Sequence, residues 1–214
     1  MKIKNVPVVD FQVIEATGNF VYGRISHADM MEIESDIEDE VETLDDFQEG
    51  EVGNDETDEE GQAVYEEIRK GSIAWLEESK YAKAAVRALV EKINARYFDL
   101  DVRSKPPEHQ YTVYQDPNDH YDWHQDFYED EPDADFRRTL SLSLCLSADD
   151  FYEGAEFFIK DGSETNVRVF KMKYGDFIIF PAETEHRVNA LRSGVRCSLV
   201  VWYGHKPPTG KGFK

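Results

Sequence analysis

The eight residues that decide the fold class are TLSLSLCL, at positions 139–146. Polar and apolar residues alternate strictly here, and a period of two is typical of a β-strand with one buried face. Similar short segments lie on both sides, and turns such as Asp161-Gly162 and Tyr174-Gly175 separate them. The other predicted strands are 110–115, 121–126, 155–159, 167–170, 177–180, 185–188 and 195–203. About eight short strands in succession predict a jelly roll of two sheets.

Residues 1–23 look like a short extended lead-in, and the residues from Ser26 to Pro106-Pro107 follow a mostly helical pattern. Ser26–Asp29 has the form of a capping box, and apolar residues then recur at spacings of three and four. The same periodicity predicts a helix over 79–97, and we interpret 58–75 as a further helix that is interrupted near Gly71. The sequence therefore predicts an α+β fold, a double-stranded β-helix (jelly roll, cupin-like) with N-terminal helices packed on one sheet.

Length and composition indicate one globular domain. The chain has 214 residues, of which 40% are hydrophobic, so it can bury a sizeable core. We expect a single domain over 1–214, with a mostly helical support region at 1–107 and a jelly-roll catalytic core at 108–205. No apolar run approaches the roughly 18 residues of a membrane span, and the N-terminus lacks the apolar stretch of a signal peptide. A cytoplasmic location is expected, and Cys145 and Cys197, each inside a predicted strand, are expected to be reduced thiols.

The charge of the chain is strongly negative and uneven. The net charge is -21, which makes nucleic acid an unlikely partner because like charges repel. Sixteen acidic residues and no Lys or Arg lie between Glu32 and Glu60, so the rest of the chain carries a net charge of only -5. We interpret this segment as a solvated helix face followed by a flexible loop, with docking of a basic partner as the alternative.

The segment His124-Gln125-Asp126 and His186, 62 residues later, contain a candidate metal site. Two histidines and one carboxylate are the ligands of mononuclear non-haem Fe(II) oxygenases, and they leave other metal positions open. His124 and Asp126 are two residues apart in a predicted strand and would therefore face the same side. His186 reaches the same metal if its strand pairs near the first. Zinc is the competing metal, although zinc sites favour additional His or Cys ligands.

Arg196 follows His186 by ten residues. A guanidinium grips a carboxylate through two parallel hydrogen bonds. This residue therefore suits a co-substrate that carries a carboxylate.

Together these segments resemble the Fe(II)/2-oxoglutarate-dependent dioxygenases, in particular the small single-domain forms of the prolyl 4-hydroxylase-like group that bacteria and bacteriophages encode. The resemblance covers residues 110–204. Residues 111–126 look like the first metal segment of that family, and 180–198 look like the second, with its co-substrate arginine. Residues 150–157 look like a family loop that usually reads Gly-Gly-Glu-Leu, and Ala155 replaces its second glycine.

The resemblance implies a cofactor site and a substrate. Fe(II) would be held by His124, Asp126 and His186, and 2-oxoglutarate by Arg196, Tyr114 and Ser198. Dioxygen is the other co-substrate, and ascorbate serves many such enzymes as a reductant. Residues Tyr121, Arg138 and Trp202 stand where protein prolyl hydroxylases surround the target proline. The predicted reaction is prolyl 4-hydroxylation in a peptide or protein, with release of succinate and CO2.

Two alternatives remain open at this point. The same chemistry would serve a free amino acid, another side chain or a nucleobase. A jelly-roll module that binds a metal or ligand without catalysis is the second alternative, and the presence of Tyr114, Arg196 and Trp202 together argues against it, because no metal-only role requires them.

Overall fold

The computed structural model describes residues 7–44, 47–50, 52–57, 63–102, 106–127 and 137–205, with only the backbone described for 52–57 and 63–67. Within these ranges the chain forms two helices, α1 (His27–Val41) and α2 (Lys80–Tyr97), and sixteen strands. The strands are β1 (Phe11–Ala16), β2 (Val21–Ile25), β3 (Gln48–Glu49), β4 (Val52–Thr57), β5 (Ala63–Lys70), β6 (Ser72–Trp75), β7 (Glu108–Tyr114), β8 (His120–His124), β9 (Arg137–Cys145), β10 (Tyr152–Gly154), β11 (Phe157–Lys160), β12 (Val167–Phe170), β13 (Asp176–Pro181), β14 (His186–Val188), β15 (Leu191–Gly194) and β16 (Arg196–His205).

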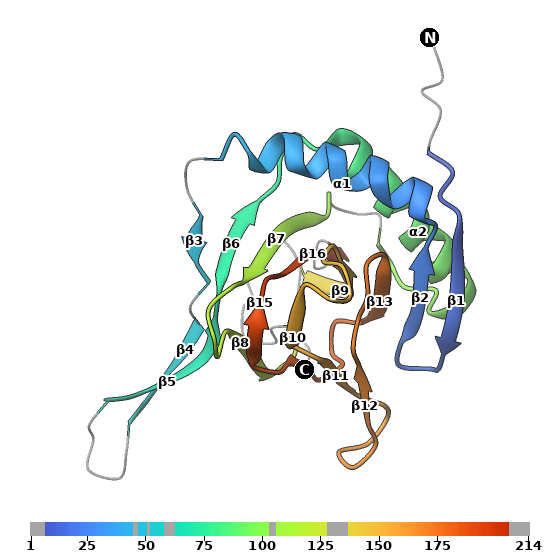
Figure 1. Ribbon diagram of the computed structural model, residues 1–214. Helices are drawn as coiled ribbons and strands as arrows, with labels where there is room; N and C mark the ends of the chain where they lie inside the picture. Colours follow the sequence, from blue (N-terminus) through green and yellow to red (C-terminus); the bar gives the residue numbers. More distant parts are fainter. Residues whose placement is uncertain are drawn as a thin grey trace.

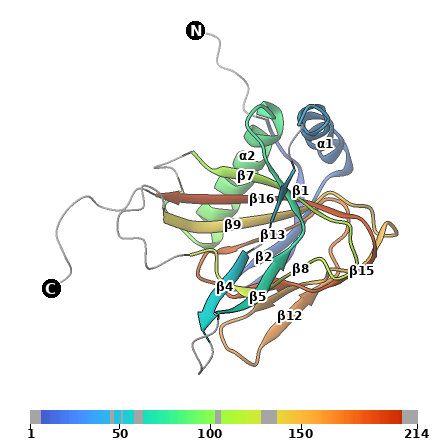
Figure 2. The ribbon, with the colours of Figure 1, turned by 90° about the vertical axis from the view of Figure 1, so that its left-hand side faces the viewer.

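Two facing sheets form the body of the molecule, and both helices cover the outer face of the larger sheet (Figures 1 and 2). The larger sheet has the strand order β1-β2-β13-β9-β16-β7-β6-β3, and the smaller has the order β12-β11-β14-β8-β5-β4. Strands β10 and β15 form a separate antiparallel pair. This arrangement confirms the predicted double-stranded β-helix with helices packed on one sheet.

The TLSLSLCL segment lies in β9, which pairs with β13 on one side and β16 on the other. Leu140, Leu142 and Leu144 are fully buried in the core beneath the helices. Ser141 and Ser143 point to the opposite face, and they are buried as well. The strand was predicted to have one buried face, but both of its faces are buried. The leucine face packs against the helices, whereas the serine face lies toward the space between the sheets.

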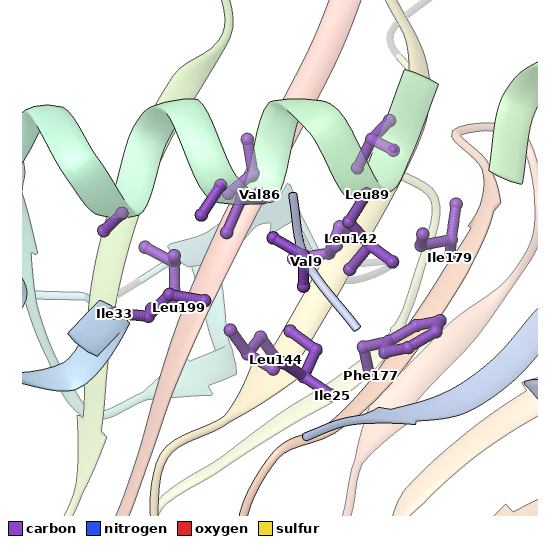
Figure 3. Close-up of a cluster of buried hydrophobic side chains, with 14 of the residues drawn as sticks. Val9, Ile25, Ile33, Val86, Leu89, Leu142, Leu144, Phe177, Ile179 and Leu199 are labelled. Atoms are coloured by element: carbon purple, nitrogen blue, oxygen red, sulfur yellow. The ribbon is translucent and has the colours of Figure 1, made fainter. Parts of the chain in front are cut away.

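The main core fills the layer between α2 and the larger sheet. In Figure 3, Val86 and Leu89 of α2 lie above Leu142 of β9 and Leu199 of β16. The buried side of α2 consists of Ala82, Ala85, Val86, Leu89, Val90, Ile93 and Asn94. The spacing of three and four that predicts this helix is thus the spacing of the residues that bury apolar surface against the sheet.

The described residues of the segment 58–75, which are 63–75, do not form a helix, and that prediction is wrong. They form β5 and β6, which pair with β8 and β7 respectively. The local sequence is rich in Glu and lacks clear alternation, so it carries little strand signal of its own. Pairing with β8 and β7, about 35–50 residues further along the chain, decides its conformation together with pairing to the neighbouring strands β4 and β3. Part of the predicted extended lead-in at 1–23 lies in the β1–β2 hairpin, which spans residues 11–25 at one edge of the larger sheet.

Three further expectations can be compared with the structure. Both cysteines are free thiols, Cys145 buried and Cys197 half-buried. Neither helix in the described part of the chain is long and apolar enough to cross a membrane. The acidic segment 32–60 starts on α1, where Glu32, Glu38 and Asp39 are exposed as predicted, but its residues 45–46, 51 and 58–60 lie outside the described residues.

Glu40, near the end of α1, connects the two helices. Its carboxylate accepts hydrogen bonds from the backbone N–H groups of Glu77 (2.5 Å), Glu78 (3.0 Å) and Ser79 (2.7 Å), and from the Ser79 hydroxyl. Ser79 is the N-cap residue of α2, and its own side chain makes no capping bond to that helix. Glu40 therefore supplies from α1 the negative charge that the N-terminus of α2 favours.

We expect Glu40→Gln to lower the free energy of unfolding by about 1–3 kcal/mol, the usual range for hydrogen bonds to a charged group. Burial raises the pKa of Glu40, but the hydrogen bonds from Ser79 and its neighbours outweigh burial and hold the pKa below its ordinary value. The stabilisation is therefore fully present above the unfolded-state pKa and is lost as the pH falls through the folded-state pKa. Urea unfolding across the acid range measures this effect. Asp39→Asn, at an exposed neighbouring acid, is the control, and equal stability of both variants would contradict the prediction.

Candidate metal centre and co-substrate pocket

Strand pairing brings the two predicted histidine ligands side by side. In the antiparallel pair of β14 and β8, His186 lies directly opposite His124. Directly opposed residues of such a pair share one face of the sheet. The two ring centroids are 4.1 Å apart.

Asp126 joins them from just beyond the end of β8. The strand ends at His124, two residues earlier than predicted, but the Asp126 backbone N–H donates to the Ala182 carbonyl (2.9 Å) and fixes the chain there. The Asp126 carboxylate lies 3.8 Å from His124 Nε2 and 3.6 Å from His186 Nε2. One ligand atom from each residue lies within 4.8 Å of the others. The structure thus brings together all three predicted metal ligands.

The hydrogen bonds of the imidazoles direct a lone pair from each ring toward Asp126. His124 Nδ1 lies 2.7 Å from the Asp122 carbonyl oxygen, and His186 Nδ1 lies 2.9 Å from the Thr184 carbonyl oxygen. A carbonyl only accepts, so each Nδ1 carries the proton and each Nε2 is free to bind a metal.

The electrostatics of the cluster suit a divalent metal. Burial, together with the nearby His186, lowers the pKa of His124 to about 3, so its ring is neutral at pH 7. Burial raises the pKa of Asp126, but the two histidines outweigh burial and hold it below its ordinary value, so Asp126 is a carboxylate. Its Oδ2 is buried without a hydrogen-bond partner among the described residues. Two imidazoles and one carboxylate match the donor set of a non-haem Fe(II) site.

Arg196 is buried in the same cavity without a counter-charge. Its side chain is among the largest that are fully buried, at 1% exposure. Its Nη1 donates to Ser198 Oγ (3.2 Å), and its Nε has no acceptor. No carboxylate of the described residues forms an ion pair with it. A buried guanidinium without a partner anion is unfavourable, so this site is suited to an anion that enters the cavity.

Tyr114 and Ser198, which the family resemblance assigns to the co-substrate site, lie next to Arg196. Tyr114 is the register partner of Arg196 across β7 and β16, and the Arg196 Cζ lies 5.9 Å from its ring centroid. Ser198 is two residues further along β16, on the same face. Both line one cavity together with Arg196 and the three candidate metal ligands.

Two of the three predicted substrate residues face this cavity. The Tyr121 ring is stacked on His124, with centroids 3.4 Å apart, and Trp202 is 4% exposed. Arg138 does not line the cavity. Its Cζ lies 3.9 Å over the Trp202 ring, and its Nη2 pairs with Glu108 (3.0 Å).

Four polar residues of the cavity were not predicted from the sequence: Arg69, Gln110, Thr112 and Ser143. Arg69 lies in the segment that was assigned to a helix, where nothing places it near the metal site. Alternation along residues 108–114, which places Gln110, Thr112 and Tyr114 on one face, was the available signal for Gln110.

Comparison with known proteins agrees with this geometry. Residues 109–204 match the model of the 2OG-Fe(II) oxygenase superfamily. This part of the chain is therefore similar to that superfamily. The superfamily uses Fe(II), 2-oxoglutarate and dioxygen, and the convergence of His124, Asp126 and His186 fits that requirement.

Individual relatives are PKHD-type hydroxylases. A PKHD-type hydroxylase of Psychrobacter sp. (strain PRwf-1) is 39% identical over 66 residues, which are 31% of this chain and 25% of that protein. Another, from Xylella fastidiosa (strain M12), is 32% identical over 110 residues, which are 48% of this chain and 46% of that protein. The alignments therefore span less than half of the length of these relatives.

Solved structures confirm the prolyl 4-hydroxylase-like fold. A Pseudomonas putida prolyl-4-hydroxylase has a TM-score of 0.60 and 18% identity, with 93% of each chain covered. A Trichoplax adhaerens prolyl hydroxylase, solved with a peptide fragment of hypoxia inducible factor, has a TM-score of 0.60 and 17% identity, with 88% of this chain and 84% of that chain covered.

Proposed function

We propose that this protein is an Fe(II)- and 2-oxoglutarate-dependent hydroxylase. The observation that carries this proposal is the buried, unpaired Arg196 in the cavity that also holds the His124–Asp126–His186 cluster. A set of metal ligands alone would suit several kinds of protein. A set of metal ligands with a buried guanidinium beside it suits a co-substrate that binds the metal at one end and carries a carboxylate at the other.

The residues of the chain have distinct roles in this proposal. His124 Nε2, His186 Nε2 and the Asp126 carboxylate hold Fe(II), and the hydrogen bonds of each Nδ1 fix the two rings. Arg196, with Ser198 and Tyr114, binds the distal carboxylate of 2-oxoglutarate and so directs the keto acid end toward the metal. When bound, the metal and its co-substrates supply the oxidation that inserts oxygen into a C–H bond, and 2-oxoglutarate is converted to succinate and CO2.

Aromatic side chains shield this centre from water. Phe157 and Phe180 line the cavity, with ring centroids 5.6 Å and 4.5 Å from that of His186. Their apolar faces exclude water from the metal side of the pocket and so limit wasteful oxidation.

For the substrate we propose a proline residue in a peptide or protein. Tyr121 and Trp202 offer aromatic faces to the cavity, and such faces pack well against a proline ring. The Trichoplax relative of the same fold binds a peptide. A free amino acid is the second candidate, and a nucleobase is disfavoured by the net charge of -21.

Anaerobic titration with Fe(II) and 2-oxoglutarate tests the assembled site. We expect the weak visible charge-transfer band of a metal-bound keto acid, followed by one succinate per hydroxylated product when oxygen and a proline-containing peptide are supplied with ascorbate as reductant. A protein that gives no band and retains zinc would instead be a binding module. A band with succinate release but an unmodified peptide would reject the peptidyl proline and direct attention to free amino acids.

A further inference from the structure

Arg69, on β5, is a second buried guanidinium in the same cavity. It is 7% exposed, and its Nη2 donates to the neutral Gln110 Oε1 (2.7 Å). Its Nε is buried with no acceptor. Among the side chains that the structure describes, no carboxylate forms an ion pair with it. Nothing in the proposed roles of the other cavity residues uses this cation.

The surroundings of Arg69 hold it near the metal cluster. Arg69 is the register partner of Tyr121 across β5 and β8. Its Cζ lies 4.8 Å from the centroid of the Tyr121 ring, whose other neighbour is the His124 ring at 3.4 Å. Stacking on Tyr121 and the bond to Gln110 fix the guanidinium before any ligand arrives, so little freedom is lost on binding.

Arg69 and Arg196 have different surroundings in the cavity. Arg69 donates to Gln110 and lies over the Tyr121 ring, which stacks on His124. Arg196 donates to Ser198. The Tyr114 side chain interacts with both guanidiniums. Arg69 is therefore the guanidinium whose stacking partner contacts a candidate metal ligand.

The net charge of the site with Fe(II) and 2-oxoglutarate bound indicates that Arg69 lacks a counter-charge. Among the described residues, the charged side chains that line the cavity are Arg69, Arg196 and Asp126. Fe(II) adds two positive charges and 2-oxoglutarate adds two negative charges. An imidazole that binds a metal is neutral. The described part of the loaded site therefore keeps one positive charge. Arg196 and the metal are matched by the two ends of 2-oxoglutarate, so the unmatched charge is that of Arg69.

We infer that Arg69 binds a carboxylate of the substrate, and that the substrate class is a compound with a carboxylate near the carbon to be hydroxylated. Such a carboxylate is either the terminal carboxylate of a proline or the side chain of an acidic residue next to it. A planar guanidinium fork is suited to either source. This inference rests on the proposed function, because it assumes that 2-oxoglutarate occupies Arg196.

Two pairs of peptides test the inference. In the first pair, the residue after proline is Glu in one peptide and Gln in the other. In the second pair, both peptides end in proline, one with a free C-terminal carboxylate and the other with a C-terminal amide. Binding to the anaerobic Fe(II)–2-oxoglutarate complex is measured from the change in the charge-transfer band, which requires no turnover. We expect the acidic member of one pair to bind at least about 10-fold more tightly than its neutral partner, as for a charged hydrogen bond. The pair that shows the difference identifies the source of the carboxylate.

Variants assign that preference to Arg69. Arg69→Gln is expected to reduce the difference within the pair to about twofold or less, whereas Arg87→Gln, at an exposed arginine on α2, should leave it unchanged. Arg69→Lys, which keeps the charge, provides the same test if Arg69→Gln does not fold, with an expected reduction to a few-fold.

Three results would overturn the inference. The first is that neither acidic peptide binds more tightly than its neutral partner. The second is that the preference persists in Arg69→Gln. The third is that Arg69→Gln weakens 2-oxoglutarate binding as much as Arg196→Lys does. Failure of the proposed function is distinguishable from these, because the unmodified protein would then form no charge-transfer band at all.

Discussion

Asp126→Asn is expected to lower Fe(II) affinity by about 100-fold or more, because loss even of a residue that only orients a ligand costs 10–100-fold in many metal sites. Asp126 supplies the only carboxylate of the cluster, within 3.8 Å of both Nε2 atoms, and it is 4% exposed. Asn has nearly the same shape and removes the negative charge. Succinate formation should fall to background, since the remaining histidines offer a divalent metal no compensating charge.

Asp122→Asn is the matched control for this change. Asp122 lies on β8 two residues before His124, and its side chain is exposed. Its backbone carbonyl accepts the hydrogen bond from His124 Nδ1, and the substitution keeps that carbonyl. Anaerobic Fe(II) binding and succinate release should be close to those of the unmodified protein. An Asp126→Asn variant that binds iron and turns over as the Asp122→Asn variant does would refute the proposed metal site.

Arg196→Lys is expected to raise the dissociation constant for 2-oxoglutarate by about 10–100-fold, the equivalent of 1.4–2.8 kcal/mol. Lysine keeps the positive charge, so electrostatic attraction persists. A single ammonium cannot make the two parallel hydrogen bonds of a guanidinium. Ser198, which now accepts from Arg196 Nη1 at 3.2 Å, would also lose its partner.

Titration of the charge-transfer band measures that dissociation constant directly. Arg192→Lys is the control, because Arg192 is an exposed arginine that pairs with Glu156 outside the cavity. Its 2-oxoglutarate affinity should remain that of the unmodified protein. An unchanged dissociation constant in Arg196→Lys would remove Arg196 from the co-substrate site and leave its burial unexplained.

The elements that were correctly predicted are those whose local pattern agrees with their environment. The TLSLSLCL alternation matches β9 because its leucines meet the helices and its serines meet the inter-sheet space. The apolar spacing of 79–97 matches α2, which buries one side on the larger sheet. The capping box at Ser26 begins α1, where the Ser26 hydroxyl accepts from the Asp29 N–H (3.2 Å).

The elements that were missed depend on partners far along the chain. β5 carries four charged residues and was predicted as helix together with β6, but the two strands lie in the sheets beside β8 and β7. Strands β10 and β15 are three and four residues long, too short for a period to be visible. Local propensity cannot reveal a strand whose stability comes from its neighbours.

Residue types and spacings predict the chemistry of this protein: two histidines, an aspartate and an arginine are spaced as is typical of an Fe(II)/2-oxoglutarate oxygenase, on a chain patterned for a double-stranded β-helix. Side-chain type and spacing are local properties, so they can be read directly. The folded structure was needed to show that His186 lies opposite His124, that Arg196 is buried without a counter-charge among the described residues, and that Arg69 lines the same cavity. Register, burial and charge pairing are set by hydrogen bonds and packing between residues distant in the chain, and no local pattern contains them.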